Sequence, residues 1–239
     1  NYITAEDVGI NPTDMEWVSK ETKHVVGLPG KSGDPSPVTA LGVYMGMKAA
    51  VKVQTGSDSL AGKKVSVQGV GHVGQYLVRF LTQEGAHVTV TDIHEASLNA
   101  MVKECDVKVV KPDEIYDVPM DIYAPCALGA TINDETLSRL KCSIVAGAAN
   151  NQLLEEQKHG KALMDKGILY APDFAINAGG VINCFSEVSG NSLEWSKKKA
   201  EEIYDTVETI LRRALQENLP SFQIANLMAE EIIKAKGTL

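Results

Sequence analysis

A glycine-rich turn between a short apolar strand and a helix constrains the fold of this 239-residue chain more than any other feature. The apolar run 65–67 precedes the loop Gly69-Val70-Gly71-His72-Val73-Gly74, and an amphipathic stretch over 75–84 follows it. A second apolar run, 88–90, then leads to Asp92. The order of strand, glycine loop, helix, strand and acid is the fingerprint of a dinucleotide-binding βαβ unit, whereas the glycines alone also occur in unrelated turns.

Each position of the loop has a physical role in this interpretation. Gly69 allows a tight turn, Gly71 lets the backbone approach a pyrophosphate without an intervening Cβ, and Gly74 permits close packing of the helix on the strand. The pyrophosphate is expected at the start of the helix, where free N–H groups point outward. Asp92 is expected to bind both hydroxyls of the adenine ribose. Because no arginine stands beside Ile93 to receive a 2′-phosphate, the pattern favours NAD over NADP.

Composition argues against several other classes of protein. The chain is 44% hydrophobic, but it has no apolar stretch approaching the roughly 18 residues that span a bilayer. With Lys+Arg 23 against Asp+Glu 31 the net charge is -8, and no basic run is long enough to grip a nucleic acid. We therefore expect neither a membrane protein nor a nucleic-acid partner.

The cysteines indicate an intracellular protein. They are scattered, without C-x-x-C pairs or histidines at metal-ligand spacing, and no secretory leader pattern opens the sequence. We expect reduced thiols, no metal site and a cytoplasmic location. The four cysteines are Cys105, Cys126, Cys142 and Cys184.

Beyond the glycine loop, short apolar runs alternate with helical stretches. Strands separated by helices of this length require right-handed crossovers, and they predict an α/β fold with a doubly wound parallel sheet. A long helix is predicted before the loop, over 36–53, with Pro37 in its first turn. The further predicted strands are 107–110, 120–124, 143–146 and 168–171, and the further predicted helices are 96–104, 133–140 and 151–166.

The two ends of the chain have patterns of their own. Residues 1–7 resemble a strand with no earlier partner, followed by a helix over 13–20, so we expect the chain to begin within another domain. Residues 192–236 are almost wholly helical, with a break at 219–221. The apolar stripe predicted to pack in the core is Ile203, Val207, Ile210, Leu211 and Leu215.

Ligands of open parallel sheets bind beyond the carboxyl ends of the strands, so the loops there are informative. The loops 125–129, 147–151 and 172–180 are small, glycine-rich and amide-bearing. Asn150 and Asn177 offer donors and acceptors for a carboxamide. Each loop alone is better explained as a plain turn, but three in register behind the fingerprint favour a nicotinamide site.

Several strings of the sequence match a known family in the family's order. The chain resembles the dehydrogenases that oxidatively deaminate glutamate, leucine, valine or phenylalanine, most closely the leucine dehydrogenase branch. This resemblance runs over nearly the whole chain and is more specific than the glycine loop. The matching strings are residues 2–9, 35–40, 68–71, 124–129, 149–153 and 176–183.

The resemblance implies a reversible reaction in which an L-amino acid passes hydride to NAD and the resulting imine is hydrolysed to a 2-oxo acid and ammonia. Asp7 occupies the position of the family's proton-handling carboxylate. The resemblance places Ala5, Thr39, Val181 and Cys184 around the substrate side chain. These residues supply no cation, so a glutamate substrate is disfavoured. Resemblance to the leucine dehydrogenase branch implies a branched aliphatic substrate. The alternatives are an aromatic amino-acid dehydrogenase and a non-catalytic NAD sensor.

The fingerprint, the loops and the resemblance together define the expected cofactor contacts. Thr39 is expected near both nicotinamide and substrate, Asn150 near the nicotinamide ribose, and Asn177 near the carboxamide or the substrate. The full set is Thr39, Gly69, Val70, Gly71, His72, Val73, Gly74, Asp92, Ile93, Cys126, Ala127, Ala148, Ala149, Asn150 and Asn177.

One departure from the family concerns the catalytic lysines, which belong to a glycine-rich segment that precedes the Asp7 region in relatives. No G-G-x-K string occurs in this sequence, so we expect a fragment that binds NAD and catalyses little alone. We expect residues 1–34 to be a remnant of an N-terminal substrate domain and residues 35–190 to form the Rossmann domain. Residues 191–239 are expected to be helices that pack on the Rossmann domain and toward the substrate domain. Family resemblance further implies a homo-oligomer acting on a small amino acid or 2-oxo acid. His72 stands where relatives commonly have asparagine.

Overall fold

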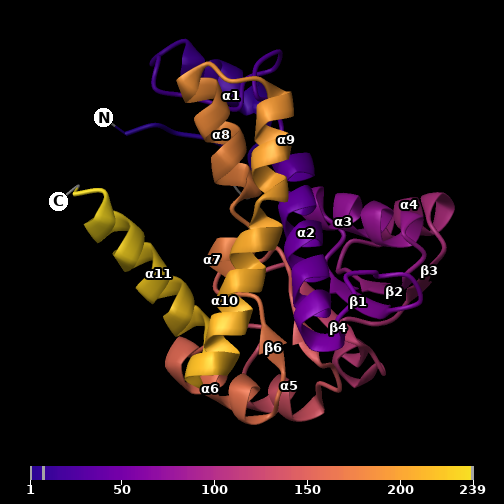
Figure 1. The fold of residues 1–239 in the computed structure, drawn as a ribbon. Helices are drawn as coiled ribbons and strands as arrows, with labels where there is room; N and C mark the ends of the chain where they lie inside the picture. Colours follow the sequence, from indigo (N-terminus) through magenta and orange to yellow (C-terminus); the bar gives the residue numbers. More distant parts are fainter. Residues whose placement is uncertain (1, 7–8, 238–239) are drawn as a thin grey trace.

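The centre of the molecule is a parallel sheet of six strands in the order β3-β2-β1-β4-β5-β6 (Figure 1). The structure is a computed structural model that describes residues 2–6 and 9–237. Its strand order is that of a doubly wound dinucleotide-binding sheet, which confirms the predicted fold class. The strands are β1 (Lys64–Gln68), β2 (His87–Thr91), β3 (Val107–Val109), β4 (Ile122–Pro125), β5 (Ile144–Val145) and β6 (Leu169–Tyr170).

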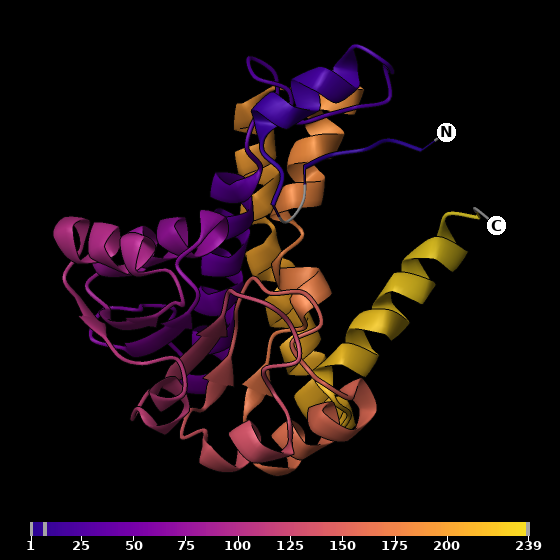
Figure 2. The same ribbon diagram turned by 180° about the vertical axis from the view of Figure 1, so that it is seen from behind.

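Helices cover both faces of this sheet (Figures 1 and 2). The helices are α1 (Pro12–Ser19), α2 (Ser36–Thr55), α3 (His72–Gln83), α4 (Glu95–Glu104), the 3-10 turn η1 (Glu114–Asp117), α5 (Asp134–Arg139), α6 (Glu156–Asp165), α7 (Asp173–Ile176), α8 (Gly179–Ser189), α9 (Leu193–Glu201), α10 (Ile203–Glu217) and α11 (Ser221–Ala235).

Two hydrophobic cores form because successive side chains of a strand point to opposite faces. Val67 of β1 and Ile122 of β4 belong to the core beneath α2 and α3. Tyr123, Val145 and Tyr170 belong to the opposite core, which η1, α5 and α6 cover. The sheet is thus buried on both sides, and its carboxyl edge is left for a ligand.

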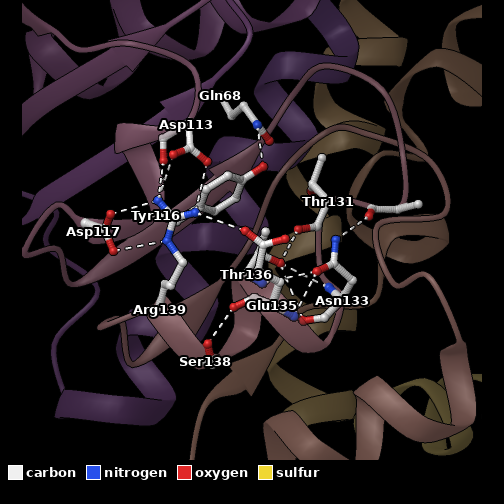
Figure 3. A network of polar contacts seen from close by, with 11 residues as sticks. Gln68, Asp113, Tyr116, Asp117, Thr131, Asn133, Glu135, Thr136, Ser138 and Arg139 are labelled. Atoms are coloured by element: carbon white, nitrogen blue, oxygen red, sulfur yellow. Dashed lines mark hydrogen bonds and ion pairs between the residues drawn. The ribbon is translucent and has the colours of Figure 1, made fainter.

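A polar network holds η1 and α5 beneath the end of β1 (Figure 3). The Gln68 amide donates to the Tyr116 hydroxyl at 2.8 Å and accepts from the Tyr123 hydroxyl at 2.5 Å. The Arg139 guanidinium pairs with Asp113 at 2.9 Å and Asp117 at 2.7 Å. These contacts fix the strand end from which the glycine loop departs.

The predicted opening strand is wrong in its described part, 2–6. Only Thr4 makes a bridge, pairing in parallel with Val25, and the rest of the segment has no ladder. The helix predicted over 151–166 begins only at Glu156, because Gln152 and Leu153 turn inward and are buried. The loop helix, by contrast, begins at His72 and not at residue 75.

The C-terminal helices also differ in detail from the prediction. The break before Ser221 is present, but α9 and α10 are separate helices divided at Glu202. Leu215 is 60% exposed, and Ala214 takes its place among the buried residues of α10. In α11 the buried residues all lie in its first five positions, and Figures 1 and 2 show the rest of that helix leaning away from the sheet.

Glu84, directly after α3, joins three parts of the first core. Its Oε1 lies 2.7 Å from Lys48 Nζ and accepts from the Leu60 N–H at 3.0 Å, while Oε2 accepts from the Tyr44 hydroxyl. Burial acts to raise the pKa of Glu84, but the bonds from Lys48, Tyr44 and Leu60 outweigh it and the pKa is lowered. The carboxylate therefore stabilises the fold in its ionised form.

We expect Glu84→Gln to lower the free energy of unfolding by about 1–2 kcal/mol at neutral pH. Because the folded pKa lies below the unfolded one, this stabilisation is present above the usual pKa of glutamate. It is lost as the pH falls through the folded value. Urea unfolding of both proteins from neutral to acidic pH measures the difference, and a difference that does not shrink on acidification would contradict the prediction.

Candidate functional site

The glycine loop at the end of β1 has the geometry that its sequence predicts. Gly69 has φ +98°, and a Cβ there would lie 2.8 Å from the Ala127 nitrogen. A Cβ on Gly74 would lie 2.0 Å from the Gly69 carbonyl oxygen, so only glycine lets α3 pack this closely on β1. The Gly69 N–H donates to the Thr91 carbonyl at 2.8 Å, which ties the loop to the end of β2.

The start of α3 is open for an anion. Gly71 is the N-cap, none of the described side chains caps the first turn, and a Cβ at Gly71 would meet nothing within 4 Å. His72 is exposed and Val73 half-buried at this end of the helix. Unpaired N–H groups and the positive end of the helix dipole together suit a pyrophosphate.

Asp92 lies beside this loop at the end of β2. Its Oδ2 accepts from the Val70 N–H at 2.8 Å, and its Oδ1 accepts from the His94 N–H at 2.8 Å. Each carboxylate oxygen keeps a further lone pair, so the two backbone bonds orient the group without using up its acceptors. The neighbouring Ile93 side chain is 80% exposed at the rim of the site.

The loop after β4 packs against the glycine loop. The Cys126 N–H donates to the Gln68 carbonyl at 2.7 Å, and Ala127 lies against Gly69. Burial raises the pKa of the Cys126 thiol to about 12, so the thiol is neutral at physiological pH. The predicted residues of this loop are therefore next to the phosphate-loop position, as small uncharged groups.

The loops after β5 and β6 meet through their asparagines. The Asn177 Nδ2 donates to the Ala148 carbonyl at 3.1 Å and to Asn150 Oδ1 at 2.5 Å. The Ala149 N–H donates to the Pro125 carbonyl at 2.9 Å, which joins these loops to that after β4. The three loops singled out from the sequence thus form one continuous rim.

Helices α2 and α8 cross closely on the other side of this rim. A Cβ on Gly179 would lie 2.3 Å from the Val38 carbonyl oxygen, and one on Gly180 would lie 3.1 Å from Thr39 Oγ1. The Thr39 hydroxyl donates to the Pro35 carbonyl at 3.0 Å. The glycine pair after Asn177 therefore allows α8 to bring Val181 and Cys184 next to Thr39.

These elements line a pocket of about 620 Å³ that is open to solvent and has a mainly apolar wall. Burial, and then the nearby Glu187 and Glu6, raise the pKa of the Cys184 thiol, so it contributes a neutral wall. The residues predicted from the sequence that line the pocket are Ala5, Thr39, Val73, Ala148, Asn150, Asn177, Val181 and Cys184. Lining residues that the sequence did not single out are Ile3, Glu6, Val26, Pro35, Gly180, Phe185 and Val188.

Glu6 is the ionisable group that sequence reasoning missed. Burial raises its pKa, Asp34 raises it further by charge repulsion, and His72 acts in the opposite direction. Its Oε2 is buried without a hydrogen-bond partner among the described residues. The predicted catalytic residue, Asp7, lies outside the described residues. The signal for Glu6 was its place beside Asp7 in one matching string.

Comparison with known proteins places this arrangement in a family. The family model described as Glutamate/Leucine/Phenylalanine/Valine dehydrogenase matches residues 30–97 and 90–234. The chain belongs to this family. The resemblance stated from the sequence is thereby confirmed.

Individual members of the family are similar to this chain over nearly its whole length. A leucine dehydrogenase of Thermoactinomyces intermedius is 55% identical over 236 residues, which are 98% of this chain and 64% of that protein. An L-tryptophan dehydrogenase of Nostoc punctiforme is 44% identical over 97% of this chain and 66% of its own length. The crystal structure of L-tryptophan dehydrogenase from that organism matches with a TM-score of 0.88 and 42% identity, covering 99% of this chain and 69% of the other. The chain thus spans about two thirds of the length of these relatives.

The structure also bears on the classes of protein that composition disfavoured. Within residues 2–6 and 9–237, no helix is long and apolar enough to cross a membrane. Over the same ranges, no group of three or more His, Cys, Asp or Glu side chains is placed so that it could hold a metal ion.

Proposed function

We propose that this chain is the cofactor-binding part of an NAD-dependent dehydrogenase that converts a branched-chain L-amino acid to its 2-oxo acid and ammonia. The observation that supports this most is the single rim in which Asp92, the α3 start and the Asn150–Asn177 pair follow one another along the carboxyl edge of the sheet. Family membership and the relatives named leucine dehydrogenase point to the same reaction.

The rim offers a group for each part of the cofactor. Bound NAD would supply the oxidant that accepts a hydride from the substrate α-carbon. Asp92, already oriented by two backbone N–H groups, holds acceptors toward the adenine ribose hydroxyls. The free N–H groups of the α3 start would bind the pyrophosphate, and the two asparagines would orient the nicotinamide half.

The pocket chemistry favours an apolar substrate side chain. Val181, Phe185 and Val188 form part of the wall on α8, and Glu6 is the carboxyl group among the described lining residues. A substrate with a second carboxylate would meet apolar groups and a like charge, which desolvation and repulsion both penalise. A branched aliphatic side chain has no charge to desolvate and is not repelled by a carboxylate.

An aromatic amino acid is the second candidate substrate class. The relatives include an L-tryptophan dehydrogenase at 44% identity, and its crystal structure superposes on this fold with a TM-score of 0.88. The pocket of about 620 Å³ is open, so its volume does not reject an indole or phenyl ring.

We expect the chain to bind NADH at least about tenfold more tightly than NADPH. The Asp92 carboxylate would repel a 2′-phosphate, and the cost of removing that phosphate from water would not be offset by an attractive charge. Fluorescence titration of the chain with each nucleotide measures both dissociation constants. Equal affinities, or no saturable binding, would contradict the cofactor assignment.

Substrate class is measured on the full-length protein that its gene encodes. Steady-state rates on leucine, valine, phenylalanine, tryptophan and glutamate, with NAD, give the ranking in kcat/KM. The proposal is supported when leucine and valine lead, and the aromatic alternative replaces it when phenylalanine or tryptophan leads. NADH binding without turnover of any of them would indicate a sensor. Light scattering of the same sample tests the further proposal of a homo-oligomer.

A further inference from the structure

Gln152 is a fully buried polar side chain directly behind the pocket rim. Its exposed fraction is 0%, and its Nε2 donates to the Gly147 carbonyl at 2.9 Å and to the Ala149 carbonyl at 3.0 Å. Both acceptors belong to the loop that follows β5. A single amide group therefore closes this loop on itself from the inside.

The orientation of this amide is determined by its partners. Two carbonyl oxygens accept from one nitrogen, so only the NH₂ end of the side chain can face them. The Gln152 Oε1 has no hydrogen-bond partner among the described residues. The two bonds from Nε2 are therefore the side-chain contacts that hold the amide in this orientation.

The same residue connects the loop after β5 to the loop after β6. The Gln152 N–H donates to Asp173 Oδ2 at 3.2 Å, and Oδ1 of this buried carboxylate accepts from the Phe174 N–H at 2.9 Å. Asp173 is the first residue of α7, and Asn177 follows that helix directly. The contacts of Gln152 thus reach the bases of both asparagine-bearing loops.

We propose that Gln152 is a positioning residue that sets the relative placement of Asn150 and Asn177 at the nicotinamide end of the cofactor. The inference rests on the proposed function. Asn177 can donate to both Ala148 and Asn150 only while the loop 147–150 keeps its curvature, and the Gln152 amide supplies two of the bonds that hold it. The glycine loop and Asp92 follow β1 and β2 and make none of these contacts.

This division of the rim predicts a selective defect. Removal of the Gln152 donors should weaken contacts to the nicotinamide half of NADH and leave the adenine half unaffected. ADP, which lacks the nicotinamide and its ribose, is the probe for the adenine half. A residue that only stabilised the fold would change the binding of both ligands together.

The test compares NADH and ADP binding to the wild-type chain and to Gln152→Met, which keeps the side-chain length but has no donor. We expect the NADH dissociation constant to rise about tenfold and the ADP constant to stay within about twofold. Leu153→Met is the matched control, because it changes the next buried side chain of the same segment without removing a polar group. The control is expected to bind both ligands like the wild type.

A second variant covers a folding failure of the first. Gln152→Asn keeps an amide, but it is one methylene too short to reach both carbonyls, and the same NADH-selective defect is expected at smaller size. An unchanged ratio of the two constants in a folded variant overturns the proposal. Failure of both variants to fold, shown by circular dichroism, also overturns it, because Gln152 would then serve folding alone. If the wild type binds neither ligand, the proposed function itself fails.

Discussion

Replacement of Asp92 by alanine is expected to raise the NADH dissociation constant by about 100-fold, the largest binding defect of any single change on this rim. The substitution removes the acceptors proposed for two ribose hydroxyls. It also releases the Val70 N–H, which donates to Asp92 Oδ2 at 2.8 Å and holds the glycine loop beside β2. Fluorescence titration with NADH measures the change.

The behaviour of NADPH distinguishes a ribose contact from a general loss of structure. Because Asp92→Ala removes the charge that repels a 2′-phosphate, NADPH binding should weaken less than NADH binding or improve. Asp92→Asn is the matched variant: its amide nitrogen must face either the Val70 or the His94 N–H, so one backbone bond is lost and an intermediate defect is expected. Unchanged affinities for both nucleotides in Asp92→Ala would remove the cofactor assignment.

The sequence predicted the βαβ unit well because its signals are local. Residue 69 has φ +98°, which favours glycine, and a Cβ on residue 74 would collide with the loop. Both requirements belong to one turn, so they appear in one short stretch of sequence. The meeting of Asn150 and Asn177 was also predictable, since the carboxyl ends of parallel strands share one edge.

Long-range contacts account for what the sequence did not predict. Residues 2–6 resemble a strand in sequence, yet only Thr4 pairs with another segment, because strand formation depends on a neighbouring strand that the pattern does not specify. The helix expected from residue 151 starts at Glu156, and the Gln152 side chain instead donates to the Gly147 and Ala149 carbonyls of the preceding loop. Periodicity within a window carries neither kind of information.

Glu6 illustrates the same limit at the site. In the sequence it is one more acidic residue beside Asp7, and nothing local distinguishes the two carboxylates. The fold places Glu6 in the pocket wall, where burial and Asp34 raise its pKa, so it holds a proton more readily than an exposed glutamate. The protonation of a group depends on its three-dimensional neighbours, which belong here to other segments of the chain.

The proton chemistry is tested by comparing Asp7→Asn with Glu6→Gln in the full-length protein. Asp7 is proposed to exchange protons with the substrate amino group and with the water that attacks the imine. In that case Asp7→Asn lowers kcat by about two orders of magnitude or more and leaves NADH binding unchanged. Glu6→Gln is the matched control, since it removes the adjacent carboxylate in the pocket wall at equal side-chain size. We expect it to retain turnover within about tenfold of the wild type.

The pH dependence of kcat/KM separates the two carboxylates further. A base with the environment of Glu6 would place the acid limb of the profile above the usual range of glutamate, because its pKa is raised. Loss of that limb in Glu6→Gln, together with near-normal turnover of Asp7→Asn, would transfer the catalytic role to Glu6. If Asp7 is the base, the acid limb persists in Glu6→Gln.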